Sequence, residues 1–377
     1  IGVGFYSRKQ ATDVNGFVLG GRTVGPWLTA FAYGTSYFSA VIFVGYAGQF
    51  GWKYGIASTW IGIGNAVLGS LIAWAVLGRR TRLITQKLDS RTMPEFFERR
   101  YNSKSLKLVS SLIIFVFLIP YTASLYNGLS RLFGMAFEID YKVCVIAMAA
   151  LTGIYVIVGG YLATAINDFI QGIIMLFGIV VVIAAVLKNY GGLTGALDKL
   201  ANVSDPAVSS TPGVFASFLG PDIFNLVCVV ILTSLGTWGL PQMVQKFYAI
   251  KDEKSIRTGT VVSTIFAVIV AGGCYFLGGF GRLTDTDVAA EGFDAIIPHL
   301  LECLPPILIG LVVILVLSAS MSTLSSLVLT SSSTLTIDFI KGTIVPKMSE
   351  KKQVLTMRIM LVVFIAISAV IAIVQYS

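Results

Sequence analysis

The chain has 377 residues, of which 55% are hydrophobic and only 12% are charged, and its mean hydropathy is +0.83. Soluble domains carry about 25% charged residues, so this composition excludes an ordinary soluble domain and indicates a membrane protein with several spanning helices. The net charge of +8 could indicate a nucleic-acid partner, but the positions of the charges explain it better as a topology signal, and no nucleic-acid binding is expected.

Few residues in the sequence could build a catalytic or metal centre. His299 is the only histidine, which excludes histidine-based clusters in this chain. The four cysteines have no metal-binding spacing and are interpreted as small apolar residues. A base–nucleophile pair is also missing from the sequence, so we expect no enzyme activity.

Nine apolar segments predict membrane-spanning helices of about 20 residues each. They cover 24–46, 55–78, 108–134, 141–159, 163–187, 222–246, 258–280, 300–340 and 354–376. The eighth is too long for one straight span, so it either continues beyond the membrane or bends after Pro305 and Pro306. Short helices are expected at 193–200 and 93–98, the second with a proline in its first turn. Both ends of the chain, Ile1 and Ser377, are interpreted as truncated.

The basic residues predict the orientation in the membrane. Most of the 27 Lys and Arg residues lie in the segments 6–23, 79–107, 246–257 and 341–358, whereas the intervening segment 285–294 is acidic. Cytoplasmic loops carry an excess of Lys and Arg, so the 6–23 loop is predicted to be cytoplasmic. We expect a multi-pass protein of the cell (plasma or inner) membrane.

Two spans carry the features of broken helices. The segment 32–40 contains Gly34, Thr35 and Ser36 near the middle of the first full span, and the segment 233–242 of the sixth span adds the helix breaker Pro241. Broken helices five spans apart are typical of inverted-repeat transporters, with 24–187 as the first five-helix repeat and 222–377 as an incomplete second one. Close helix packing by the glycines is the alternative.

Polar side chains in apolar spans add a second signal. Ser322, Ser325 and Ser326 share one face of the serine-rich segment 319–326, where they could either tie two helices together or help to hold a cation. Asp168 lies at the cytoplasmic start of the fifth span. It is either a helix cap or a ligand for a hard cation such as sodium, which prefers oxygen donors.

Five segments resemble, in order, those of the sodium:solute symporter family, whose members include bacterial proline, pantothenate and sialic acid transporters. They are 19–26 (LGGRTVGP), 155–161 (YVIVGGY), 167–172 (NDFIQG), 239–241 (GLP) and 321–325 (MSTLS). The resemblance implies an all-α fold with a ten-helix inverted-repeat core and extra helices, of which the first family helix survives here only as residues 1–5.

The resemblance also implies where sodium binds. The family's common sodium site would fall on the backbone carbonyls of Thr35, Phe38 and Ala319 and on the hydroxyls of Ser322 and Thr323. Some members use a second sodium site, which would fall on Asp168, Ser322, Ser325 and Ser326.

Departures from the family pattern concern the solute. In the proline transporter an aspartate follows the serine that corresponds to Ser36, but this chain has Tyr37 there, and Thr233 and Thr237 replace a Trp and a Tyr. These changes disfavour proline, and the 239–241 segment resembles the pantothenate branch, which suggests a small carboxylate-bearing solute. The candidate solute-binding residues are Tyr33, Tyr37, Ser39, Tyr121, Asn127, Thr233, Thr237, Trp238 and Gln242.

The sequence therefore predicts a sodium-coupled secondary active symporter that imports a small organic solute across the lipid bilayer by alternating access. Two alternatives stay open. The same fold could serve a membrane sensor with a cytoplasmic signalling domain outside this chain, and Asp168 with the serines could couple transport to protons instead of sodium.

Overall fold

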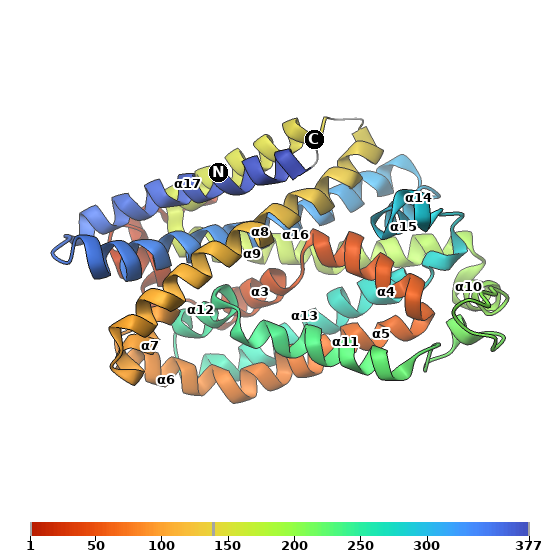
Figure 1. Cartoon of the computed structure of the whole chain (residues 1–377), viewed down its shortest axis with the longest axis horizontal. Coiled ribbons are helices and arrows are strands. Elements are labelled where there is room, and N and C mark those ends of the chain that lie inside the picture. Colours follow the sequence, from red (N-terminus) through yellow and green to blue (C-terminus); the bar gives the residue numbers. More distant parts are fainter. Residues whose placement is uncertain (1, 138–139, 376–377) are drawn as a thin grey trace.

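The computed structural model describes residues 2–137 and 140–375 and consists of helices that run along the long axis of the molecule (Figure 1). In these two ranges there is no β-strand, only isolated bridges such as Val24 with Ile250. The α-helices are α1 (Gly2–Ser7), α2 (Val14–Leu19), α3 (Pro26–Tyr37), α4 (Ala47–Tyr54), α5 (Thr59–Gly64), α6 (Arg79–Lys87), α7 (Met93–Tyr101), α8 (Lys104–Phe137), α9 (Tyr141–Asn189), α10 (Gly192–Ala201), α11 (Ile223–Leu235), α12 (Pro241–Ala249), α13 (Glu253–Gly278), α14 (Val288–Glu291), α15 (Ile296–Leu301), α16 (Pro306–Thr334) and α17 (Glu350–Gln375). Wider π-helical turns at Val41–Tyr46, Asn65–Ile72, Trp74–Gly78 and Leu335–Ile344 connect or extend some of them.

Within the described ranges, six continuous helices are long and apolar enough to cross a membrane, and the bent pair α11 and α12 would make a seventh. Two of the six are interrupted by a glycine with positive φ, Gly55 in the segment Val41–Lys87 and Gly160 in α9. The left-handed region is accessible to glycine at little cost, so each glycine allows a sharp turn between two passes.

The two halves of α9 cross the membrane in opposite directions. At one terminus of α9, the Tyr141 hydroxyl donates to the carbonyl of Ala372 near the end of α17. At the other terminus, the Asn189 side chain donates to the carbonyl of Cys303 just before α16. Because the end of α17 and the start of α16 lie at the same end of the molecule, both termini of α9 lie there too. The predicted spans 141–159 and 163–187 are therefore separate passes.

Two of the predicted boundaries are wrong. The first span does not end at position 46, because α4 continues it to Tyr54. The eighth span does not begin at position 300, because α15 is a separate short helix and a proline at the first position of α16 starts the span at Pro306. The predicted short helices are confirmed as α7, in which Pro94 lies in the first turn, and α10.

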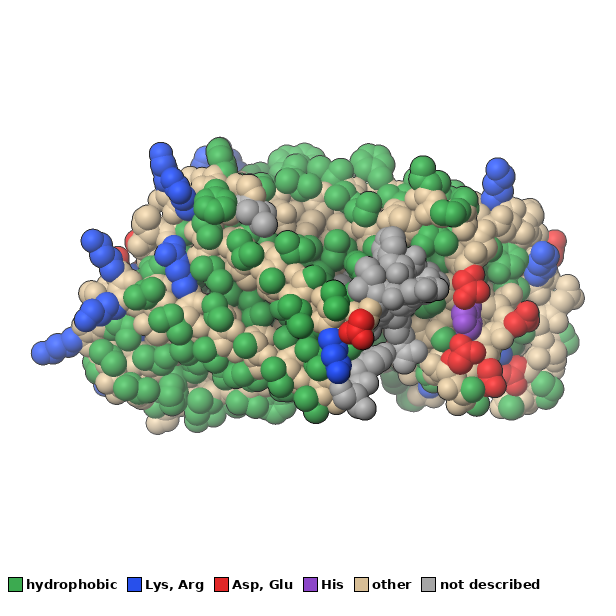
Figure 2. Space-filling view, turned by 90° about the horizontal axis from the view of Figure 1, so that it is seen from above, with side chains coloured by type: hydrophobic (Ala, Val, Ile, Leu, Met, Phe, Trp, Pro, Cys, Tyr) green, Lys and Arg blue, Asp and Glu red, His purple; other side chains and the backbone are tan. Residues whose placement is uncertain are grey.

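Charged side chains separate between the two ends of the molecule. Figure 2 shows most of the visible Lys and Arg side chains at one end, whereas most of the visible Asp and Glu side chains, with the one histidine, lie at the other. The basic end carries α6, α7 and the turn between α16 and α17, and the acidic end carries α10, α14 and α15 (Figure 1). By the positive-inside rule the basic end is cytoplasmic, which agrees with the orientation expected from the sequence.

The two helices α4 and α13 pack backbone against backbone. A Cβ atom added to Gly51 would lie 1.9 Å from the carbonyl oxygen of Gly278, and one added to Gly278 would lie 2.0 Å from the carbonyl oxygen of Ala47. Small residues allow such close approach between membrane helices, where burial against lipid gives no hydrophobic driving force. This interface therefore has no room for a methyl group.

We expect Gly51→Ala to destabilise the protein by about 1–3 kcal/mol, because the new methyl group must push α4 away from α13. Thermal unfolding of the purified protein in detergent would measure this as a lower Tm. Gly310→Ala is the matched control, because a Cβ atom at Gly310 in α16 would meet no atom within 4 Å. Equal Tm values for the two variants would contradict the packing described here.

Candidate functional site

The first full span breaks immediately after α3. The helix ends at Tyr37, Phe38 is extended with ψ 125°, and the helical segment resumes around Val41. The predicted centre of the break was therefore three to four residues too early, because Gly34 itself is helical. A Cβ atom on Gly34 would lie 2.5 Å from the ring of Phe266 in α13, so the packing interpretation is correct for this glycine.

The sixth span breaks where the sequence predicts. After α11 the chain makes a tight 3-10 turn over Gly236–Gly239, Leu240 is extended, and Pro241 begins α12. The two halves of this span are bent by 54°. A Cβ atom on Gly236 or Gly239 would meet nothing within 4 Å, so these glycines do not serve close helix packing.

Five oxygen atoms meet between the first break and α16. The Thr323 hydroxyl lies 3.3 Å from the carbonyl oxygen of Thr35, 3.2 Å from that of Phe38 and 3.1 Å from that of Ala319. The Ser322 hydroxyl lies 3.2 Å from the carbonyl oxygen of Thr35 and 3.0 Å from that of Ala319. All five residues are buried. The structure thus brings together the complete set of atoms expected for the first sodium site.

These oxygen atoms have too few protons for their contacts. Ser322 and Thr323 each have one hydroxyl proton, but together they make five close contacts with the three carbonyl oxygens. A hydroxyl proton that is shared between two carbonyl oxygens points directly at neither of them. Two protons therefore cannot make five well-aligned hydrogen bonds. A hard cation held at about 2.4 Å from each ligand would place neighbouring ligands about 3.4 Å apart, close to the spacing found here.

Asp168 does not cap a helix, because it lies well inside α9, eight residues after the turn at Gly160. It is fully buried, and neither of its carboxylate oxygens has a hydrogen-bond partner. Of the other residues expected at a second sodium site, Ser325 donates its hydroxyl proton to the carbonyl oxygen of Ser322 at 2.8 Å. The hydroxyl of Ser326 lies 3.0 Å from that of Ser36, at the end of α3.

Lys246 is the charged residue of this region that the sequence analysis misplaced. The sequence assigned it to a basic cytoplasmic loop, but it lies in α12 and is only 1% exposed. Its ammonium donates to the Ser326 hydroxyl at 3.0 Å and lies 3.9 Å from Asp168 Oδ2. The 54° bend turns this segment into the protein interior. The sequence did contain a signal for this buried position, because Lys246 follows the helix breaker Pro241 by little more than one turn in an apolar span.

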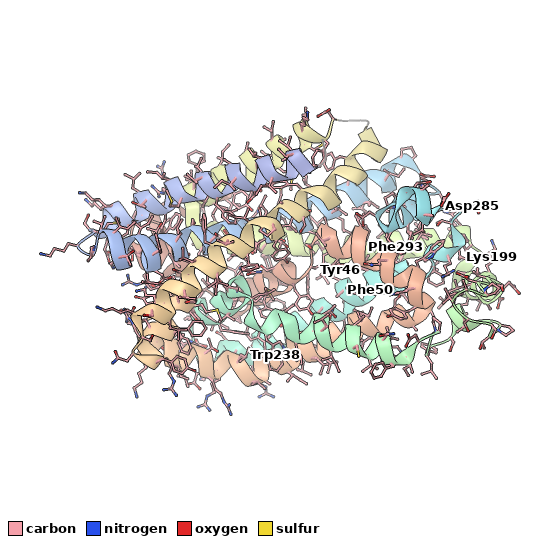
Figure 3. All side chains as sticks on the ribbon, in the orientation of Figure 1. Tyr46, Phe50, Lys199, Trp238, Asp285 and Phe293 are labelled. Carbon is pink, nitrogen blue, oxygen red and sulfur yellow. The ribbon has the colours of Figure 1, made fainter. Side chains whose placement is uncertain are left out.

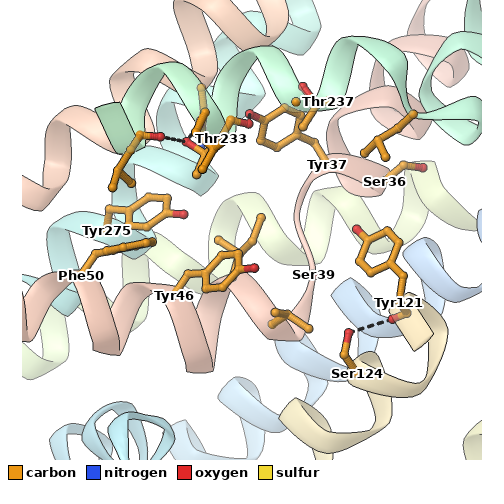
Figure 4. Close-up of a pocket in the computed structure, with 17 residues that line it drawn as sticks. Ser36, Tyr37, Ser39, Tyr46, Phe50, Tyr121, Ser124, Thr233, Thr237 and Tyr275 are labelled. Carbon is orange, nitrogen blue, oxygen red and sulfur yellow. Dashed lines mark hydrogen bonds between the residues drawn. The ribbon is translucent and has the colours of Figure 1, made fainter. Parts of the chain in front are cut away.

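A cavity of about 490 Å³ lies beside both breaks (Figure 4). Its wall combines aromatic rings with hydroxyl groups and one amide, and it includes five of the nine residues expected to bind the solute. Those five are Tyr37, Ser39, Tyr121, Thr233 and Thr237. The wall also contains Ser36, which the sequence analysis named only for the break, and polar or aromatic residues that it did not single out, namely Tyr46, Phe50, Asn65, Ser124 and Tyr275. A ligand of drug-like or smaller size would fit a cavity of this volume.

Asn65 organises one side of the cavity. Its side-chain oxygen accepts hydrogen bonds from Thr233 at 3.0 Å and from Ser234 at 3.1 Å, and the Tyr37 hydroxyl donates to the Thr233 carbonyl at 3.0 Å. These contacts fix the second span and the tip of α3 against the end of α11. A single asparagine in an apolar segment is costly unless it has such partners, which could have identified it from the sequence.

Three of the expected solute-binding residues lie outside the cavity wall. Tyr33 is buried and donates its hydroxyl proton to Gly69, and Trp238, which is labelled in Figure 3, donates its indole proton to Leu68. Gln242 is fully buried, and its side-chain amide has no hydrogen-bond partner. The side chain of Asn127, the remaining candidate, lies outside the described residues.

The cavity extends toward the external end of the molecule. Figure 3 places Tyr46 and Phe50, both in its wall, between the first break and the external end marked by Asp285 and Lys199. On the cytoplasmic side, Trp74 packs edge-on against Tyr33 and Phe247 with ring centroids 5.4 Å and 5.0 Å apart. These rings separate the cavity from the cytoplasm.

Arginine contacts close the cytoplasmic end further. Arg82 donates to the carbonyl oxygens of Ile250 and Lys251 just after α12, and Arg22 donates to that of Ser90 at 2.6 Å. Guanidinium groups are suited to this task because they offer several donors in a rigid plane. These contacts hold α12 and the residues after it against the cytoplasmic helices.

A sequence model of the sodium:solute symporter family matches residues 17–377. The chain belongs to this family. Sodium:solute symporters are transporters and not enzymes, so the chain is a sodium-coupled symporter of a small organic solute and a multi-pass protein of the plasma membrane. The membrane-sensor and proton-coupled alternatives are not favoured.

Individual relatives agree with this assignment. The sodium/proline symporter of Staphylococcus aureus (strain JH9) is 33% identical over 386 residues, which cover 98% of this chain and 72% of that protein. The osmoregulated proline transporter OpuE of Bacillus subtilis (strain 168) is 28% identical, with 98% of this chain and 74% of that protein covered.

A solved structure shows the same fold. The sodium-coupled sialic acid symporter in a substrate-bound outward-open state matches 99% of this chain and 79% of its own, with a TM-score of 0.79 and 17% sequence identity. This similarity confirms the inverted-repeat transporter fold with broken first and sixth core helices.

The separation of the cavity from the aromatic cluster around Trp74 predicts which positions an external water-soluble reagent can reach. In a variant with Cys228 and Cys303 replaced by serine, we expect Ser39→Cys to react with a membrane-impermeant thiol reagent added outside, because Ser39 lines the cavity. Met243→Cys should not react, because Met243 does not line the cavity and packs among the aromatic rings of Tyr33, Trp74 and Phe247. Labelling followed by mass spectrometry would compare them, and preferential labelling at position 243 would contradict this separation.

Proposed function

We propose that the transported sodium ion binds among the carbonyls of Thr35, Phe38 and Ala319 and the hydroxyls of Ser322 and Thr323. The observation that carries this proposal is the excess of oxygen contacts over protons at this point. All five atoms come from the first break and from α16, so the ion would hold the two elements together. Sodium is the transported ion here, not a resident cofactor.

We propose that the solute binds in the neighbouring cavity and is coupled to sodium through the shared break. Along this break the roles alternate: Thr35 and Phe38 offer carbonyls to the sodium site, whereas Ser36, Tyr37 and Ser39 line the cavity. Either ligand would order the same short segment and so favour binding of the other. Rocking of the repeats, which we place at 24–187 and 222–377, would then expose both ligands to the cytoplasm.

The charge of the cavity supports a small monocarboxylate as the solute. Among the described residues that line the cavity, none is charged. A sodium ion next to Ser36 would add one positive charge at the wall, which a carboxylate could balance. Hydroxyl groups on Ser39 and Tyr121 could donate hydrogen bonds to it. Buried charges are stable only when they are paired in this way.

Proline is a second candidate, because the relatives described above are named as proline transporters. Its carboxylate could bind as just described, but its ammonium group would need an acidic or strongly polar partner. In this cavity the ammonium would meet Tyr37, Thr233 and Thr237, which are neutral. The monocarboxylate therefore fits the charge of the cavity better.

Ser322→Ala and Thr323→Ala are each expected to raise the sodium concentration for half-maximal uptake by about tenfold or more, equivalent to about 1.4 kcal/mol or more, because each removes one ligand. Uptake by proteoliposomes as a function of external sodium would measure this. Ser320→Ala is the matched control, since Ser320 is buried in the same helix and its hydroxyl has no hydrogen-bond partner. Unchanged sodium dependence in both test variants would contradict the proposed site.

The solute can be identified by thermal-shift measurements. We expect small monocarboxylates to raise the Tm of the purified protein only when sodium is present, because each ligand orders the break that the other uses. Proline should give no such shift. A sodium-dependent shift with proline and with no carboxylate would contradict the monocarboxylate proposal and leave sodium symport intact.

A further inference from the structure

The ion pair between Lys246 and Asp168 lies at the place where the resemblance assigns a second sodium ion. Asp168 and Ser326 are two of the four residues expected there, and the Lys246 ammonium contacts both, at 3.9 Å from Asp168 Oδ2 and at 3.0 Å from Ser326 Oγ. It also lies 5.2 Å from the centre of the Tyr161 ring, which offers a favourable face to a cation. A carboxylate, a hydroxyl and an aromatic face thus surround one ammonium group.

This group of residues is closed off from water. Asp168 is 0% exposed and Lys246 is 1% exposed. The inner half of the sixth span delivers the lysine, because the residues of α12 from Gln242 to Ala249 are all buried. Buried charged residues in membrane spans usually pair with each other, so the carboxylate and the ammonium together form a neutral unit.

A sodium ion at the same place would upset this balance. It would add a second positive charge about 4 Å from the ammonium, and at the effective dielectric of a protein such repulsion weakens binding by roughly a thousandfold. The first site is different, because its ligands are neutral carbonyls and hydroxyls. None of the five residues that supply those ligands is charged.

We propose that Lys246 is a tethered cation that occupies the second sodium position, so that this symporter binds and transports one sodium ion per cycle. The inference rests on the proposed function, because it takes the first site as the sodium site. It extends that function, because it attributes the number of sodium ions bound per cycle to one side chain. Lys246 acts here as a positioning residue: it neutralises Asp168 and holds Ser326, which in turn contacts Ser36 at the cavity wall.

Direct measurement of sodium binding tests the proposal. Equilibrium binding of radioactive ²²Na⁺ to the purified full-length protein gives the number of ions per molecule, independently of transport. We expect one ion for the wild type and two for Lys246→Gln, because removal of the ammonium frees Asp168 and Ser326 to bind sodium. Lys246→Gln combined with Asp168→Asn should return to one ion, because the carboxylate is then gone as well.

Two further variants test whether the positive charge at position 246 sets the number of bound ions, and whether loss of a lysine elsewhere has the same effect. Lys246→Arg keeps a tethered cation and should bind one ion. Lys254→Gln removes an exposed lysine in the first turn of α13 and should also bind one ion. The steepness of sodium-dependent uptake gives a second readout, with a Hill coefficient near one for the wild type and above one for Lys246→Gln.

Two ions bound by the wild type would overturn this inference and leave the proposed function standing. One ion bound by a folded Lys246→Gln variant, with Tm close to that of the double variant, would also overturn it. If Lys246→Gln does not fold, the number of ions bound by the wild type decides, with one ion supporting the inference and two overturning it. No sodium bound by the wild type would contradict the proposed sodium site itself.

Discussion

The contact between two hydroxyl groups of α16 and the carbonyls at the end of α3 is the interaction on which the rest of the structure depends. In a lipid environment every backbone polar group needs a partner inside the protein, so a span can break only where another element supplies one. Ser322 and Thr323 do so for Thr35 and Phe38. Without these hydroxyls the break would leave unpaired carbonyls, and with them it becomes a place for a cation.

The same break also determines where the cavity lies and how it is closed. Residues between the carbonyl ligands face the cavity, while Tyr33, one turn earlier in α3, joins the aromatic rings on the cytoplasmic side. One segment of α3 thus borders the sodium site, the cavity and the inner closure. A movement of α3 by a small distance would affect all three, which is what alternating access requires.

The sequence allowed the sodium-site residues and the bend at Pro241 to be predicted, because each depends on a local signal. Ser322 and Thr323 are hydroxyl residues in an otherwise apolar helix, and a proline must interrupt the helix in which it lies. The exact position of the first break was less predictable, since Gly34 looks like a helix breaker but instead makes room for Phe266. Its role depends on a helix more than 200 residues away in the chain.

The environment of Lys246 could not be read from its neighbours in sequence. Lysines near the ends of spans usually belong to cytoplasmic loops, and the loop that follows is indeed basic. Only the bend in the sixth span places this lysine next to Asp168 and Ser326, which come from α9 and α16. Asp168 and Ser326 each lie about 80 positions from Lys246 in the sequence, so only the tertiary structure brings the three residues together.

The glycine contacts of α13 bear on how the molecule divides into moving parts. Gly278 touches the backbone of α4, and a Cβ atom on Gly62 of α5 would lie 2.5 Å from the Cα atom of Gly272. Backbones in direct contact interlock through their carbonyls and cannot slide without separating first. The outer half of the first span, α5 and α13 are therefore held together through their backbones, and this unit is joined to α3 only through residues 38 and 39, where the helix is interrupted.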